Sequence, residues 1–197
     1  MKKLTTLFTA VVAVALVAFK PVAPTTYKVD TEKSKIEWTG KKVTGQHTGT
    51  IKLASGEVAV NGKVPTTGKF VIDMTSMDNT DLSGDGKAKL LGHLKSEDFF
   101  GTEKYPTASF QTTKITPAGA GKVNVTGNLT VKGKTSVITF PATYTLANNT
   151  LNVNALNVKV DRTKHDIRYG SKSFFASIGD KAIDDEFLLN INLVATR

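Results

Sequence analysis

The amino-acid sequence predicts an all-β domain, an antiparallel sandwich or barrel of short strands with one helical insertion. Apolar and polar residues alternate with period two in successive segments, which is typical of strands with one buried face. Turn-forming residues separate these segments at intervals of about 8 to 12 residues. One segment, around residues 87–100, has a helical pattern instead.

The N-terminus has the pattern of a secretory signal peptide. Lys2 and Lys3 precede an apolar run from Leu4 to Phe19 that only three threonines interrupt. This run is shorter than the roughly 20 apolar residues of a spanning helix, which disfavours the alternative of an uncleaved anchor. We therefore expect residues 1–23 to be removed and the mature protein to be periplasmic or secreted. The remainder, about 170 residues, has the size of one domain.

The net charge is positive and dispersed along the chain. Removing Lys2, Lys3 and Lys20 lowers it from +9 to +6. Such a surface favours a soluble protein and allows a weak contact with an anionic membrane surface. No nucleic-acid recognition motif is present, so we expect no such partner. Because the chain has no cysteine, an apolar core rather than disulfides must stabilise it.

The first strands lie between residues 36 and 74. Alternation predicts them over residues 36–41, 51–53, 58–60 and 70–74. Asn61-Gly62 lies between two of these segments, and this dipeptide is a strong signal for a tight hairpin turn.

A turn-rich acidic segment follows, and then a helix is predicted over residues 87–94. Three leucines have helical spacing there and no β-branched residue intervenes. Ser96, followed by two acidic residues, has the pattern of a helix N-cap. It predicts a further helical turn that carries Phe99 and Phe100 and ends at Gly101.

Five strands complete the chain. They are predicted over residues 108–115, 123–131, 137–145, 151–160 and 187–194, with turns between them. In the last strand the odd-numbered positions are apolar, whereas Asn190 and Asn192 lie on the opposite face.

Two features favour a barrel over a sandwich. The chain has ten Phe, four Tyr and one Trp, many on the apolar side of a predicted strand, and 16 glycines, which permit the bends that close a barrel. A barrel of eight strands holds one small ligand or is filled by its own side chains. The residue pattern leaves these two interiors open.

The residues offer little for metal or covalent chemistry. His47, His93 and His165 are far apart in the sequence and have no partner at ligand spacing. The loop from Asp81 begins like a calcium-binding EF-hand loop but places Gly92 where the bidentate glutamate is required. The chain lacks a Gly-x-Ser-x-Gly elbow and a phosphate-binding glycine loop. We expect no metal, no cofactor and no catalysis, and an enzyme acting on a lipid is the least favoured alternative.

Four segments add specific information. The longest is residues 93–110, which read HLKSEDFFGTEKYPTASF. The others are Tyr27-Lys28-Val29-Asp30 with Ser34, residues 125–135, and Val160-Asp161-Arg162-Thr163. Together, and in their order along the chain, they resemble the YceI-like family of lipid- and polyisoprenoid-binding proteins across nearly all of the mature chain. The chain departs from the family at Glu32-Lys33-Ser34, where a His-Ser pair is common, and residues 164–169 resemble a subgroup variant. These departures bear on the ligand's head group rather than on the fold.

The resemblance implies an extended, eight-stranded, antiparallel, lipocalin-like β-barrel over residues 27–197, which the helical insertion closes. It also implies an apolar tunnel that holds an isoprenoid chain. The candidate lining residues are large apolar side chains of the predicted strands and of the insertion: Trp38, Phe70, Ile72, Phe110, Leu129, Phe140 and Leu156 from strands, and Leu90, Leu94, Phe99 and Phe100 from the insertion.

The predicted function is therefore to bind, and to carry or store, a long apolar isoprenoid-type lipid, with a quinone-like molecule as one candidate. The alternative is an exported stress-response or interaction protein whose barrel is filled by side chains and has no lipid ligand. The charged residues at 161–162 and 184–186 would form an ion network at the barrel mouth. The sequence leaves the oligomeric state open between a monomer and a homodimer.

Overall fold

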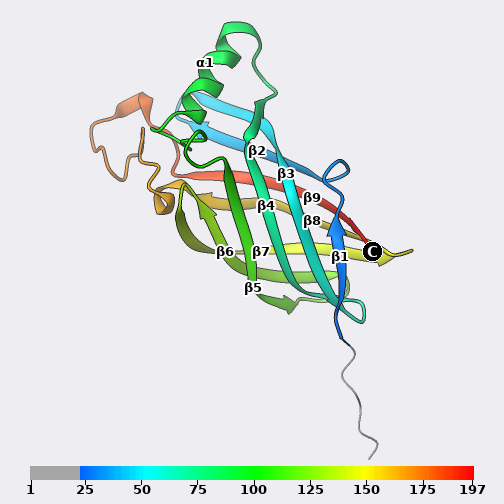
Figure 1. Cartoon of the computed structure of the whole chain (residues 1–197). Helices are drawn as coiled ribbons and strands as arrows, with labels where there is room; N and C mark the ends of the chain where they lie inside the picture. The colour runs from blue at the N-terminus through cyan, green and yellow to red at the C-terminus, as the bar shows by residue number, and fades with distance from the viewer. Residues whose placement is uncertain (1–22) are drawn as a thin grey trace, which may run out of the picture.

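The computed structural model describes residues 23–197, which form one closed antiparallel barrel (Figure 1). Its elements are β1 (Thr25–Val29), β2 (Lys35–Lys42), β3 (Gly45–Asn61), β4 (Val64–Asn79), α1 (Gly84–Lys95), β5 (Thr107–Pro117), β6 (Lys122–Val131), β7 (Lys134–Ala147), β8 (Thr150–Asp161), the 3₁₀ turns η1 (Arg162–His165) and η2 (Gly179–Lys181), and β9 (Glu186–Thr196). Around the wall the order is β2, β9, β8, β7, β6, β5, β4 and β3, and β3 pairs again with β2. The predicted eight-stranded barrel is confirmed.

β1 and β2 share one position in this wall, one after the other. Both pair with β3 on one side and with β9 on the other. The turn between them is fixed by Asp30, whose carboxylate accepts hydrogen bonds from the backbone N–H groups of Glu32 and Lys33. Ser34 Oγ accepts another from the N–H of Val194 in β9, at 3.0 Å. Alternation did not predict β1, because in its five residues only Tyr27 is buried.

The hairpins follow the predicted turn chemistry. β3 and β4 join at Gly62, which has a φ of 62°. Lys132 and Gly133 both have positive φ between β6 and β7, as do Asn148 and Asn149 between β7 and β8. Two consecutive residues of positive φ twist a hairpin in the sense that the flanking strands require.

The helical insertion differs in part from its prediction. α1 is confirmed and is longer than the predicted 87–94. Ser96 does not begin a second helical turn. It ends α1, since both its backbone N–H and its Oγ donate to the carbonyl oxygen of His93. Phe99 and Phe100 lie instead in hydrogen-bonded turns, which close at Gly101 in a left-handed conformation with a φ of 56°.

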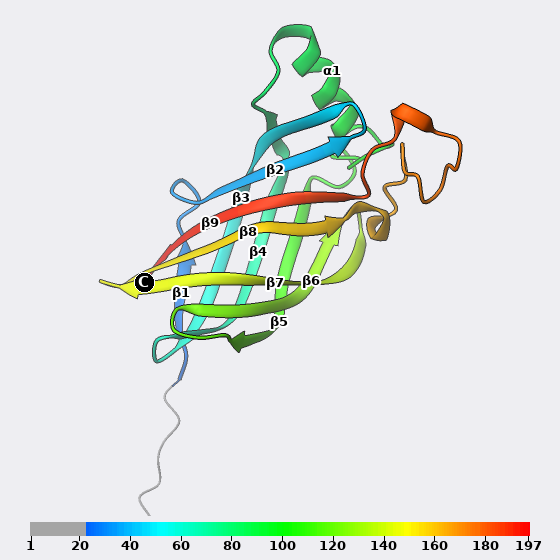
Figure 2. The ribbon, with the colours of Figure 1, turned by 180° about the vertical axis from the view of Figure 1, so that it is seen from behind.

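α1 and the segment between β8 and β9 lie at the same end of the barrel, as Figures 1 and 2 show from opposite sides. The N-terminal end of β1 lies at the other end. Within residues 23–197, none of the helices has the length and apolarity that crossing a membrane requires. The predicted signal peptide, apart from its last residue, lies outside the described residues.

Candidate functional site

The barrel contains two neighbouring apolar cavities. The first has a volume of about 120 Å³ and extends toward the β3–β4 hairpin, away from α1. Every position of the barrel wall contributes to its lining, which comprises Ile36, Leu53, Val58, Pro65, Thr67, Gly68, Phe70, Ile72, Phe110, Thr112, Ile115, Val123, Val125, Leu129, Ile138, Phe140, Ala142, Tyr144, Val153, Ala155, Val158, Leu189, Ile191 and Leu193. None of these residues is charged, so this cavity suits a hydrocarbon.

The second cavity has a volume of about 130 Å³ and lies at the α1 end. Its apolar lining includes Trp38, Leu94, Phe99 and Phe100, and its charged lining residues are Arg162 and Asp184. Ile36, Ile72, Leu129 and Leu189 line both cavities, which therefore meet across these four side chains.

The inner face of the wall is not fully packed. Phe70, Phe110 and Phe140 line the first cavity, yet each is only half-buried. Their rings follow one another across β4, β5 and β7, with centroids 6.3 Å and 5.7 Å apart. Part of each ring therefore borders the cavity. The structure thus contains a hollow rather than a filled interior.

Glycines keep the large rings against the wall. A Cβ added to Gly68 would lie 2.8 Å from the ring of Phe70, and one added to Gly127 would lie 2.5 Å from the ring of Phe110. The ring of Trp38 covers Gly49 in the same way. Each ring occupies the space beside a glycine that the side chain of any other residue would need. Because the rings lie against the wall in this way, the centre of the barrel stays open.

The structure brings most of the predicted lining residues together. Trp38, Leu94, Phe99 and Phe100 line the cavity near α1; Phe70, Phe110 and Phe140 line the other; and Ile72 and Leu129 line both. They come from β2, β4, β5, β6, β7, α1 and the turns that follow α1.

Leu156 and Leu90 are corrections to the predicted lining. Leu156 is 65% exposed and lies on the outside of the barrel. The pairing of β8 with β9 shifts register between Ala155 and Val158, so both of those residues face inward and Leu156 does not. Leu90 is half-buried on α1 but lines neither cavity, because α1 contributes only its last turn, through Leu94.

Arg162 is built into the wall of the cavity near α1. Its side chain is 3% exposed. Its nitrogens donate hydrogen bonds of 2.8–3.0 Å to four backbone carbonyl oxygens, those of Ile167, Tyr169, Ile183 and Asp184. One side chain thereby fixes both ends of the long segment between β8 and β9. The predicted ion network forms only in part, since Arg162 pairs with Asp185 at 3.5 Å whereas Glu186 pairs with Lys159.

The charge of Arg162 is balanced inside the protein. Burial lowers the pKa of Arg162, whereas the carboxylates of Asp185, Asp161 and Asp184 raise it. Asp185 Oδ1 lies 3.5 Å from Nη2 of Arg162 and accepts no hydrogen bond. The guanidinium also lies over the ring of Phe99, 5.7 Å from its centroid. The cavity near α1 therefore has a polar edge with little net charge.

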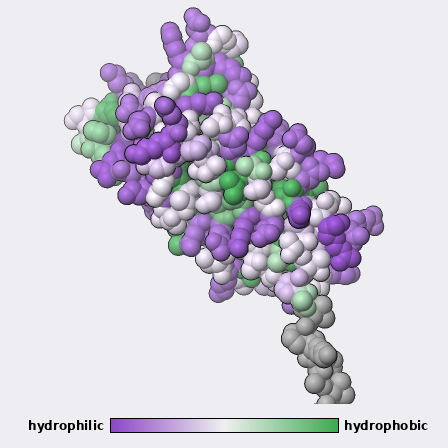
Figure 3. Space-filling view, viewed as in Figure 1, coloured by the Kyte–Doolittle hydropathy of each residue, from purple (hydrophilic) through white to green (hydrophobic). Residues whose placement is uncertain are grey.

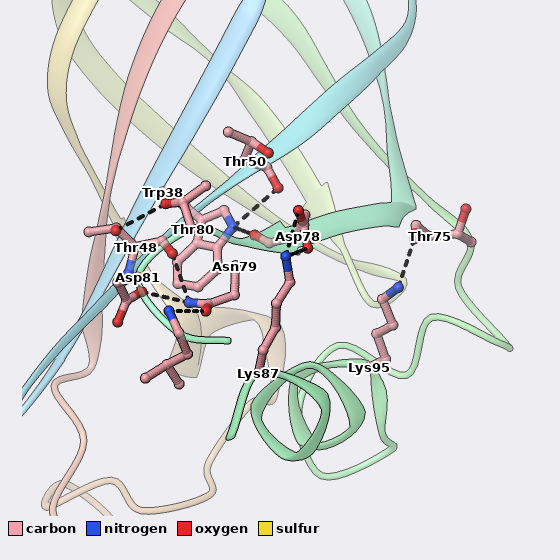
Figure 4. Close-up of polar contacts among 11 residues, drawn as sticks. Trp38, Thr48, Thr50, Thr75, Asp78, Asn79, Thr80, Asp81, Lys87 and Lys95 are labelled. Atoms are coloured by element: carbon pink, nitrogen blue, oxygen red, sulfur yellow. Dashed lines mark hydrogen bonds and ion pairs between the residues drawn. The ribbon is translucent and has the colours of Figure 1, made fainter. Parts of the chain in front are cut away.

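A polar rim attaches α1 to the barrel (Figure 4). Trp38 Nε1 donates to the carbonyl oxygens of Thr50 and Asp78 at 3.3 and 3.1 Å. Lys87 of α1 pairs with the Asp78 carboxylate at 2.8 Å, and Lys95 donates to the carbonyl oxygen of Thr75 at 2.9 Å. No residue of α1 is fully buried. Polar contacts therefore contribute much of the attachment of α1 to the barrel.

Asp81 organises the same rim. Its carboxylate accepts hydrogen bonds from the N–H of Thr48 and from Asn79 Nδ2, and it contacts His47 Nδ1 at 2.8 Å. Burial alone would raise the pKa of Asp81, but the hydrogen bonds from Thr48, His47 and Asn79 outweigh it and lower the pKa to about 2.

The three histidines occupy separate places. His165 is buried in η1, where Nδ1 contacts the carbonyl oxygen of Lys134 at 2.8 Å and Nε2 contacts Ser136 Oγ at 3.1 Å. His93 packs edge-on against the rings of Phe99 and Tyr169. Residues 23–197 contain no group of three or more His, Cys, Asp or Glu side chains that could hold a metal ion.

Some lining residues were not among the predicted candidates. Ile138 and Val153 line the first cavity, and Leu189 lines both. All three lie in strands that alternation did predict, so their inward direction was visible in the sequence. The candidates taken from these strands were Phe140 and Leu156, so these three aliphatic residues were left out.

Comparison with known proteins identifies a family. The model of the YceI-like domain matches residues 27–195. A UPF0312 protein of Vibrio parahaemolyticus is 35% identical over 103 residues, which cover 51% of each chain. A UPF0312 protein of Pseudomonas fluorescens is 29% identical over 142 residues, 71% of this chain and 72% of its own. The chain thus aligns with only about half the length of the first of these relatives.

Solved structures share the fold. The crystal structure of BcnA from Burkholderia cenocepacia matches with a TM-score of 0.69 and 27% identity, over 85% of this chain and 99% of its own. The structure of a polyisoprenoid-binding domain from Saccharophagus degradans, described as implicated in plant cell wall breakdown, matches with a TM-score of 0.65 and 18% identity. That match covers 86% of this chain and 97% of the domain.

Proposed function

The chain belongs to the YceI-like domain family, and from that premise we propose that it binds one long, apolar, isoprenoid-type lipid inside its barrel. The protein carries or stores this lipid without changing any bond in it. The observation that supports the proposal most directly is the apolar hollow, in which one of two adjoining cavities has no charged lining residue at all. The similar fold of a domain described as polyisoprenoid-binding supports the choice of lipid class.

Burial of the hydrocarbon supplies the affinity. An isoprenoid chain that transfers several hundred Å² of apolar surface from water gains on the order of 10 kcal/mol at about 25 cal/mol per Å². The ordering of the chain and its lost translational freedom reduce this gain considerably. A wall of aliphatic and aromatic side chains satisfies this requirement without specific hydrogen bonds.

The lipid has a preferred direction in this proposal. Its tail lies in the uncharged cavity, and its head group lies at the α1 end, where Arg162 and Asp184 are the charged lining residues. Arg162 already faces Asp185 at 3.5 Å, so a neutral head group with hydrogen-bonding oxygens suits this edge. A quinone-like head group is one such candidate.

The experiment is a comparison of lipid content in two aspartate variants. Phe140→Asp places a carboxylate in the first cavity, whereas Leu156→Asp places one on the outer surface. We expect organic extraction and native mass spectrometry to find a stoichiometric long-chain lipid in the wild type and in Leu156→Asp, and little or none in folded Phe140→Asp. Equal lipid in the two variants, or an empty wild type recovered repeatedly from its own host, would contradict the proposal.

The place of action is part of the proposal. The basic, then apolar, N-terminal pattern supports export to the periplasm or the exterior. N-terminal sequencing of the mature protein tests this, and a mature chain that still begins at Met1 would overturn it.

A further inference from the structure

Exposed aromatic side chains gather on the segment between β8 and β9. Tyr169, Phe174 and Phe175 are 48%, 45% and 52% exposed. They lie on residues 164–181, which we call the mouth loop. Figure 3 shows apolar residues on this segment, at the upper left of the view. Aromatic rings exposed together in this way mark an interaction surface.

This apolar surface is continuous with the cavity near α1. The ring of Tyr169 packs 5.8 Å from the ring of Phe99, which lines that cavity. Ile183, just beyond the mouth loop, lines it as well. Arg162 holds both ends of the segment through backbone carbonyl oxygens, so the loop is fixed beside the opening.

The mouth loop itself is basic, although Glu97 and Asp98 line a surface depression together with Tyr169 and Phe175. Residues 164–181 contain Lys164, Arg168, Lys172 and Lys181 against Asp166 and Asp180, a net charge of +2. Arg168 lies over the ring of Phe174, 4.7 Å from its centroid, while it pairs with Asp166 at 2.8 Å. A set of aromatic rings bordered by lysine and arginine complements the surface of an anionic bilayer.

We propose that the mouth loop docks the protein on anionic lipid bilayers and that the barrel exchanges its lipid there. The rings of Phe174 and Phe175 enter the headgroup region, and the basic residues contact lipid phosphates. The cargo then passes beside Tyr169 and Phe99 without crossing bulk water. Docking stands on the exposed surface alone, whereas the exchange step rests on the function proposed above.

Vesicle binding tests the docking step. The probe is a vesicle of phosphatidylglycerol and phosphatidylcholine in equal parts, with pure phosphatidylcholine as the comparison. Phe174→Ser/Phe175→Ser is expected to weaken partitioning onto the anionic vesicles by about tenfold. The matched control, Val137→Ser/Leu156→Ser, removes two apolar side chains that are 61% and 65% exposed elsewhere on the barrel, and it should bind as the wild type does. Lys172→Glu should weaken binding to the anionic vesicles only.

Two further measurements separate this inference from the proposed function. Lipid content by native mass spectrometry should be unchanged in Phe174→Ser/Phe175→Ser, while its transfer of lipid between vesicles slows. An empty wild type that still binds vesicles would overturn the exchange step and leave docking intact. Undiminished vesicle binding by the loop variant would overturn docking. So would a wild type that ignores vesicles and forms a dimer, measured by light scattering, that the loop variant lacks.

Discussion

Gly68 and Phe70 lie two residues apart on the same face of β4, and the ring takes the space beside the glycine that a side chain would need. Gly68→Ala adds a methyl group 2.8 Å from that ring. Because the end of the ring is free to rotate inward, we expect the variant to fold, at a cost of about 1–3 kcal/mol, and to lose volume in the uncharged cavity. Lipid content by native mass spectrometry should fall.

The control is Gly40→Ala in β2, where an added Cβ meets no atom within 4 Å. Its lipid content and thermal stability should match those of the wild type. Full lipid occupancy in Gly68→Ala would show that the position of the Phe70 ring does not limit the hollow.

His165 makes stability depend on pH. Burial lowers its pKa below the ordinary value of 6.5, and the hydrogen bond to the carbonyl oxygen of Lys134 opposes this only in part. The unfolded chain therefore takes up a proton at a higher pH than the folded protein does. The free energy of unfolding should be highest above pH 6.5 and should fall as the pH drops from 6.5 through the folded pKa.

Denaturant unfolding on both sides of pH 6.5 measures this dependence, and His165→Gln should flatten it. A glutamine that keeps both hydrogen-bonding ends supplies a non-titrating side chain of similar reach. An unchanged pH slope in His165→Gln would assign the dependence to other groups.

At the scale of elements, the bulge in β8 decides which residues face the hollow. Asn157 has a φ of 53°, and its N–H donates to Asn190 Oδ1 at 2.9 Å. A β-branched residue is strained in this left-handed conformation, so Asn157→Val should cost about 1–3 kcal/mol, whereas Asn157→Gly should be nearly neutral. Denaturant midpoints of the two variants measure the difference. Equal midpoints for Asn157→Val and Asn157→Gly would mean that β8 changes its register with β9 at no cost in stability.

The same bulge shows how far the sequence predicts this site. Period two assigns the faces of a strand correctly until a register shift intervenes, and in an unbroken strand Leu156 would share the inward face of Val158 and Val160. The tight turn at Asn61-Gly62 was predictable because the left-handed conformation of Gly62 favours glycine. The position of Ser96 at the end of α1 was not predictable, because a serine after a helix and a serine before one have the same local sequence pattern.

Some features of the barrel interior could be predicted from the sequence and others could not. Large apolar residues on predicted strands, such as Phe110 and Phe140, could be assigned to the lining from the sequence. The packing of Phe110 against Gly127 could not, because these two residues meet only through the register of β5 with β6. The acceptors of Arg162 were also hidden, since backbone carbonyl oxygens leave no trace in residue identity.

At the scale of the whole molecule, the two ends of the barrel differ. Near β1, Val60, Leu151 and Ala195 are almost completely buried around Tyr27. The end near α1 carries the helix, the mouth loop and the polar edge of its cavity. The tightly packed residues near β1 therefore stabilise the barrel beside a hollow that is less densely packed.

Filling the hollow should stabilise the entire barrel, because a ligand that binds only the folded state adds its binding free energy to unfolding. Organic extraction of the lipid should therefore lower the thermal midpoint. Reloading with a long-chain isoprenoid alcohol at about 100 times its Kd should restore about 2.7 kcal/mol, roughly 5–10 °C for a chain of this size. Phe140→Asp should show no such shift, because its carboxylate occupies the apolar cavity. Equal midpoints for loaded and extracted wild type, measured by calorimetry, would contradict binding of the lipid to the folded barrel.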